Sequence, residues 1–148
     1  MVDSTPPLPG LSPVQGKAVV LRFDGGRLSS EGGLLALREI ERRLGVADRL
    51  AGCLKDPRAP ERIGHRLADI IRFRMLMIAA GYEDGNDADA LRRDPMFKLA
   101  LDRLPSDDEL CSQSTISRLE NLPDAAPRPG VDRAVLRLVP TGAEAHRP

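Results

Sequence analysis

The sequence predicts a mainly α-helical fold with one short β-strand near its N-terminus. Apolar residues recur at spacings of three and four over much of the chain, as they do on the buried faces of helices. Only one short run is rich in β-branched residues, which favour strands. The length of 148 residues fits a single domain. A hydrophobic content of 41% with few aromatic residues is enough for an aliphatic core.

The composition excludes several classes of protein. Lys and Arg number 22 and Asp and Glu number 22, so the zero net charge excludes a strongly basic nucleic-acid coat. An aromatic content of 3% argues against a stacking platform for single-stranded nucleic acid. The two cysteines, Cys53 and Cys111, do not form a disulfide framework. With no long apolar run and no signal peptide, we expect a cytoplasmic protein that spans no membrane.

We expect three parts along the chain. Residues 1–16 carry four prolines and should be a disordered leader, residues 17–123 should be helical, and residues 124–148 should be a disordered tail. The helical region opens with the predicted strand, Ala18–Phe23, which ends in a glycine-rich turn. Because a lone strand leaves backbone groups unpaired, its partner should lie in another chain or in a missing part of the protein.

The first predicted helix begins at a Ser29 or Ser30 cap and ends at Gly45. Its charged residues lie off an apolar stripe at helical spacing, which should face the core. This stripe consists of Leu34, Leu37, Ile40 and Leu44.

Five further elements follow in order. A second helix is expected over Val46–Leu54, followed by a proline-containing loop. The third is expected over Glu61–Ala80 and should be buried in its apolar second half. After a polar turn, the spacing predicts a short helix from residue 87 to 93, another that starts at Pro95, and a last one capped within residues 112–115.

Two sets of residues resemble metal or nucleophile sites only superficially. The acidic run from Glu83 to Asp89 lacks the ligand spacing of a Ca²⁺ loop and is better explained as a capped, solvated turn. The cysteines and histidines show no short metal-binding spacing, and no Cys–His nucleophile pair stands out. We therefore expect no metal-binding and no catalytic residue here.

Two segments are candidates for nucleic-acid binding. The first segment, around the third helix, has five arginines and two acidic residues, a local excess of three positive charges. The arginines are Arg58, Arg62, Arg66, Arg72 and Arg74, and the acidic residues are Glu61 and Asp69. This set fits a phosphate-binding surface and an internally paired surface equally well. In the last helix, Gln113 and Arg118 could read base edges, and Ser114 and Thr115 suit phosphates. Spacing alone favours an ordinary capped helix there, with Ile116 and Leu119 turned inward.

Three blocks together resemble one known family. They are FDGGRLSSEGGLL at residues 23–35, GYEDGNDAD with LRRDP at residues 81–95, and SQSTISRLEN at residues 112–121, with a weaker match over residues 50–58. The chain resembles group 1 DDE transposases of bacterial insertion sequences over roughly residues 23–124, in the order and spacing of that family.

The resemblance implies DNA transposition. Such enzymes bind the terminal inverted repeats of their element and use three carboxylates and two divalent metal ions, Mg²⁺, on a ribonuclease-H-like sheet. It further implies that the helical region serves DNA binding and assembly. From the residues themselves we expect Gln113, Ser114, Thr115 and Arg118 to contact DNA and Arg62 and Arg66 to contact phosphates.

The resemblance stops near Asp124, before the family's catalytic sheet, and no acidic residue matches a catalytic position. We therefore expect a truncated, N-terminal transposase fragment that is inactive alone, holds no cofactor and carries a disordered or frameshifted tail, as a frameshift or deletion would produce. Two alternatives remain open. The fragment could bind and inhibit intact transposase, or a second copy of itself, or it could be a decayed product without function.

Overall fold

The computed structural model describes residues 8–20, 31–54 and 56–121, and all statements below concern these residues. Within them, the chain forms helices and 3₁₀ turns, so the mainly helical expectation is confirmed. The elements are α1 (Leu34–Leu44), α2 (Val46–Cys53), η1 (Pro60–Arg62), α3 (Leu67–Ala79), η2 (Gly85–Asp87), α4 (Ala88–Leu91), α5 (Pro95–Ala100) and α6 (Gln113–Glu120).

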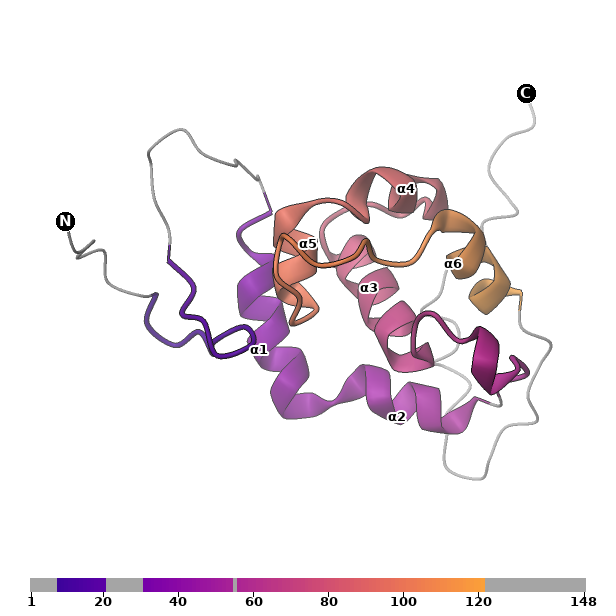
Figure 1. Cartoon of the computed structure of the whole chain (residues 1–148). Helices are drawn as coiled ribbons and strands as arrows, with labels where there is room; N and C mark the ends of the chain where they lie inside the picture. The colour runs from indigo at the N-terminus through magenta and orange to yellow at the C-terminus, as the bar shows by residue number, and fades with distance from the viewer. Residues whose placement is uncertain (1–7, 21–30, 55, 122–148) are drawn as a thin grey trace.

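Helix α3 is the centre around which the others pack. Figure 1 shows α1 and α5 on one side of it, α4 and α6 on the other, and α2 across one end. Contacts join α2 to α3, α1 to α5, and α6 to both α3 and α4. α3 can be surrounded in this way because it is apolar on most sides.

The core is aliphatic with a small aromatic centre. Phe73 of α3, Phe97 of α5 and Ile116 of α6 are fully buried. The Phe73 and Phe97 rings meet edge to face with centroids 5.7 Å apart, and Tyr82 lies 6.1 Å from Phe97. The aromatic residues that the structure describes, Phe73, Tyr82 and Phe97, therefore gather where α3, α5 and the turn after α3 meet.

Several helix ends lie where the sequence predicts them. Gly45 ends α1 in the left-handed conformation at φ 60°, which a residue without Cβ adopts readily. Asp94 accepts hydrogen bonds from the Met96 and Phe97 N–H groups and caps α5, whose first residue is Pro95.

The sequence predicts the wrong buried side for the second half of α1. Ile40 and Leu44 are 51% and 54% exposed, whereas Arg38 is 1% exposed. The Arg38 guanidinium is satisfied by polar partners, as buried charges must be. It donates to Asp102, to Glu39 at 2.8 Å, and to the backbone carbonyls of Ser12 at 2.9 Å and Pro13 at 3.1 Å.

Glu41 is the second charged residue of α1 that is buried, at 8% exposure. Its carboxylate accepts hydrogen bonds from the N–H groups of Val46 at 3.1 Å and Ala47 at 2.9 Å. These are free donors at the start of α2, so a side chain of α1 caps the next helix. The corner between the two helices is fixed by this carboxylate.

The third helix is shorter than predicted. It begins at Leu67 rather than Glu61, because Pro60–Arg62 forms a separate 3₁₀ turn and the backbone is extended at Ile63 and Arg66. Arg62 lies in this turn and Arg66 directly precedes α3.

The predicted strand Ala18–Phe23 is not confirmed. Residues 18–20 are not in a strand, and residues 21–23 lie outside the described residues. The described N-terminal segment instead has an isolated antiparallel bridge between Val14 and Lys17.

Residues 8–16, expected to be part of a disordered leader, lie against α1, where Ser12 binds Glu39 through its N–H and its hydroxyl. The proposed Ser29 and Ser30 caps and the tail 124–148 lie outside the described residues.

Candidate nucleic-acid interface

Helix α6 is fixed at its N-terminal end by a carboxylate from another helix. The Gln113 N–H donates to Asp89 Oδ1 of α4 at 3.0 Å. Ser112 makes no side-chain cap bond; its hydroxyl instead lies within 3.2 Å of the Ser114 and Thr115 hydroxyls. The predicted cap within residues 112–115 is therefore replaced by a cap from 24 residues earlier in the chain.

The C-terminal end of α6 is held by a buried ion pair. Arg74 of α3 is 4% exposed, and its Nε donates to Glu120 Oε1 at 2.7 Å. The same guanidinium donates to the carbonyls of Tyr82 at 3.3 Å and Glu83 at 2.7 Å. Arg74 thus joins the GYEDGNDAD block to the SQSTISRLEN block.

The turn before α4 packs closely on the inner face of α6. A Cβ on Gly85 would lie 3.7 Å from Ile116 Cγ2 and 3.8 Å from Glu120 Oε2. Ile116 is fully buried, as the sequence predicts. α6 is therefore fixed at both ends and along its inner side.

The predicted residues of α6 divide into two groups. Ser114 and Arg118 are exposed and four residues apart, so they lie on one face. Gln113 and Thr115 are half-buried, and the Gln113 side chain donates to Ser117 Oγ at 3.1 Å. Arg118 forms no ion pair with any residue that the structure describes.

Asn121 is a further exposed polar residue that the sequence reasoning missed. It follows Arg118 by three residues and continues the same face, and its Nδ2 donates to the Ser117 carbonyl at 2.7 Å. The spacing of 114, 118 and 121 was the signal that could have found it.

Two more arginines of the predicted basic cluster have structural partners, in addition to Arg74. Arg58 binds Asp56 through Nε at 2.8 Å and Nη2 at 2.6 Å, and this side-chain hydrogen bond lowers the pKa of the Asp56 carboxyl. Arg72 binds Asp48 at 2.7 Å, Asp69 at 3.1 Å and Glu41 at 3.5 Å. The local charge excess is therefore reduced at Arg72 by Glu41 of α1 and Asp48 of α2, which lie outside the segment that was counted.

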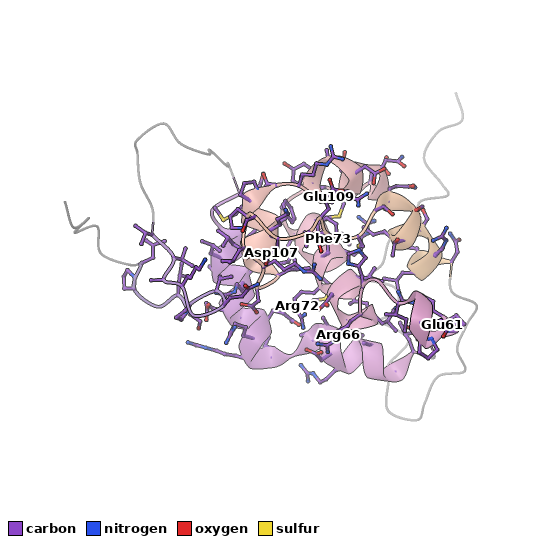
Figure 2. All side chains as sticks on the ribbon, viewed as in Figure 1. Glu61, Arg66, Arg72, Phe73, Asp107 and Glu109 are labelled. Carbon is purple, nitrogen blue, oxygen red and sulfur yellow. The ribbon has the colours of Figure 1, made fainter. Side chains whose placement is uncertain are left out.

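Arg66 remains as a candidate phosphate contact. Its side chain is 75% exposed, and its distance of 3.7 Å to Asp48 marks a loose surface pair. Figure 2 shows Arg66 and Arg72 on the side of the molecule that α2 covers. The backbone of Arg62 is in η1, and its side chain lies outside the described residues. No bond among the described residues joins Arg66 to α6.

A family model for the transposase DDE domain, group 1, matches residues 11–147. The chain belongs to this family of DDE transposases. The match includes residues 124–147, which lie beyond the last of the three sequence blocks. Comparisons with curated proteins and with solved structures find no match.

Intact DDE transposases use divalent metal ions, and the described part of this transposase does not fit such a site. It contains no group of three or more His, Cys, Asp or Glu side chains that could hold a metal. Within the acidic run, Asp84 accepts hydrogen bonds from Asn86 N at 2.9 Å and Nδ2 at 3.1 Å, which is the predicted capped turn. No helix in the described ranges has the length and apolar character to cross a bilayer.

Among the described residues, Cys111 and His65 lack the properties of a nucleophile and its partner. Cys111 is 2% exposed, and burial raises the pKa of its thiol to about 12. The thiol is therefore protonated at neutral pH, whereas the thiolate is the reactive form. Burial also lowers the pKa of the His65 imidazole, which is therefore uncharged at neutral pH. His146 lies outside the described residues.

Proposed function

We propose that the helical region binds the DNA ends of a mobile element, the terminal inverted repeats, for a DDE transposase. The observation that carries the proposal is Arg118: an exposed arginine without an ion pair among the described residues, on a helix fixed at both ends. Such a guanidinium can bind a guanine edge in a major groove with two hydrogen bonds.

The other predicted residues have supporting roles in this proposal. Ser114 on the same face is placed to contact DNA next to Arg118. Gln113 and Thr115 are half-buried, so they contribute less than the sequence suggests. Arg66 and Arg62 are proposed phosphate contacts, which position a protein on DNA without reading its sequence. A DNA partner also fits the cytoplasmic location that the sequence predicts.

We propose that this chain does not itself carry out the chemistry of strand transfer. The support is that the described residues hold no cluster of metal-binding carboxylates. The helical region would then bind and assemble, while an intact family member supplies the metal-binding carboxylates and the cutting and rejoining of DNA. Purified chain with Mg²⁺ should accordingly leave a DNA substrate uncut under conditions in which it binds that DNA.

The test of DNA binding begins with selection from a pool of random duplexes by the purified full chain. Binding of the enriched duplex is then measured by fluorescence anisotropy. Arg118→Ala should weaken binding by about 1–3 kcal/mol, roughly 5- to 150-fold, if Arg118 reads a base. Arg43→Ala is the matched control, since Arg43 is an exposed arginine in the last turn of α1. Equal binding by the Arg118 variant and the parent would refute the assignment.

One observation favours a second candidate function, a protein-interaction fragment that inhibits intact transposase or pairs with a second copy. Ile40 and Leu44 are more than half exposed on the outer face of α1, and Ala36 on that side is exposed as well. Binding through such an apolar face should change little with salt, whereas phosphate binding weakens steeply. Loss of inhibition in Ile40→Ser, with DNA binding retained, would identify this function.

A further inference from the structure

The two ends of α6 differ in how they can receive DNA. The N-terminal end of a helix normally attracts phosphate, because its free N–H groups and the helix dipole favour negative charge. In this chain Asp89 already holds that position, with Oδ1 accepting from the Gln113 N–H at 3.0 Å. The favourable site for an anion is therefore occupied by a side chain of the protein.

The Asp89 carboxylate is exposed and only loosely paired with a cation. It is 62% exposed, and its nearest cation is Arg92 at 3.8 Å. Arg92 itself binds Glu109 more closely, at 2.8 Å. A DNA phosphate that approached the start of α6 would meet this exposed carboxylate and be repelled.

The exposed side of α6 has the opposite character. Ser114, Arg118 and Asn121 are exposed along one side at spacings of four and three. The hydrogen bond from Asn121 Nδ2 to the Ser117 carbonyl fixes the amide, and it uses one of the two N–H donors of that group. An asparagine amide pairs with adenine in the major groove, as an arginine does with guanine.

We infer that Asp89 excludes phosphate from the backbone N–H groups at the N-terminal end of α6 and so directs DNA to the exposed side of the helix, formed by Ser114, Arg118 and Asn121. The inference rests on the proposed DNA-binding function. It adds one residue that repels DNA from the wrong position and one that reads a base. Asp89 acts by charge and Asn121 by hydrogen bonding.

The test of Asp89 uses Asp89→Asn in the full chain, with a mixed-sequence duplex and the enriched duplex as probes. The asparagine oxygen can still accept from the Gln113 N–H, so the variant removes the charge and keeps the cap. Binding to the mixed-sequence duplex should become several-fold tighter, and its dependence on log salt should steepen by about 0.9, the value for one added phosphate contact. The ratio of specific to non-specific affinity should fall.

The matched control is Asp108→Asn, which changes the same charge at an exposed residue of the loop before α6. Equal gains in the Asp89 and Asp108 variants would overturn the inference, because a general charge effect would then explain both.

The test of Asn121 uses Asn121→Ala. This variant should bind the enriched duplex more weakly and the mixed-sequence duplex as well as the parent does. An equal loss on both duplexes would show that Asn121 does not read a base. If the parent chain binds neither duplex, the proposed function fails and this inference fails with it. If the parent binds both and Asp89→Asn has no effect, only the inference fails.

Discussion

Arg74 and Glu120 form a partly buried ion pair, with Nε and Oε1 2.7 Å apart and the two residues 46 positions apart in the sequence. The guanidinium also binds two backbone carbonyls of the turn that follows α3. One side chain therefore positions both the turn at residues 81–83 and the end of α6. The direction in which α6 presents Arg118 depends on this contact.

Replacing Arg74 by Leu should lower the free energy of unfolding by about 2–4 kcal/mol, because the Glu120 carboxylate and two carbonyls lose their donor. Urea unfolding of the variant and the parent measures the difference. Arg93→Leu is the control, since Arg93 pairs with Glu109 at the surface and is 73% exposed. Its loss should cost less than about 1 kcal/mol. Similar losses in both variants would contradict the structural role of Arg74.

The exposed half of α1 gives a second prediction. Ile40→Ala should change the free energy of unfolding by about 0.5 kcal/mol or less, as exposed substitutions do. Ile116→Ala makes the same chemical change at a fully buried position and should cost about 2–5 kcal/mol. A large loss at Ile40, measured on the isolated chain, would mean that the helix face predicted from the sequence is the buried one after all.

Acid should loosen the N-terminal segment from α1. The hydrogen bond from the Ser12 N–H is the main cause that lowers the pKa of the Glu39 carboxyl below its usual value of 4.5, and the Ser12 hydroxyl and Arg38 add to it. Because the folded-state pKa is the lower one, this contribution to stability is present above pH 4.5 and is lost as the pH falls through the folded-state pKa.

The Glu39→Gln variant isolates this effect. Its free energy of unfolding should decline less with acid than that of the parent, when both are followed by urea unfolding from neutral to acidic pH. The pKa values of Asp56 and Asp107 are also lowered, by hydrogen bonds from Arg58 and from the Leu104 N–H, so some acid decline remains in the variant. Parallel curves for the two proteins would speak against the Ser12–Glu39 contact.

The two cysteines should differ sharply in reactivity. Cys53 is half-buried on α2, whereas Cys111 is buried and the pKa of its thiol is raised to about 12. Iodoacetamide should therefore modify Cys53 in the native chain and reach Cys111 only after unfolding. Mass spectrometry of peptides from native and urea-treated chain measures both sites. Rapid modification of native Cys111 would show that the packing around it is looser than described.

Local signals in the sequence were sufficient for many helix ends and for the inner side of α6. Gly45, Asp94 and Pro95 act through the backbone of their own turn, so their effect can be read without knowledge of distant residues. Ile116 lies inward as the helical spacing of the last block predicts. Ser114 and Arg118 lie outward for the same reason.

Contacts between distant residues explain what the sequence could not reveal. Arg38 is buried because Asp102, 64 residues later, and the carbonyl of Ser12, 26 residues earlier, satisfy its guanidinium. The cap of α6 comes from Asp89, and the serine next to the helix is not used. The apparent charge excess around α3 left out Glu41 and Asp48, which bind Arg72 but lie outside that segment of the sequence.

The aromatic centre of the core gives the chain a natural optical reporter. Tyr82 is the single tyrosine and there is no tryptophan, so ultraviolet-excited emission of the protein arises from this one ring. Its hydroxyl donates to Glu31 Oε1 at 3.0 Å, and its ring meets Phe97. Tyrosine emission is quenched by such a carboxylate and recovers when the contact opens. A rise in fluorescence therefore reports, without any label, when the turn after α3 separates from the segment before α1.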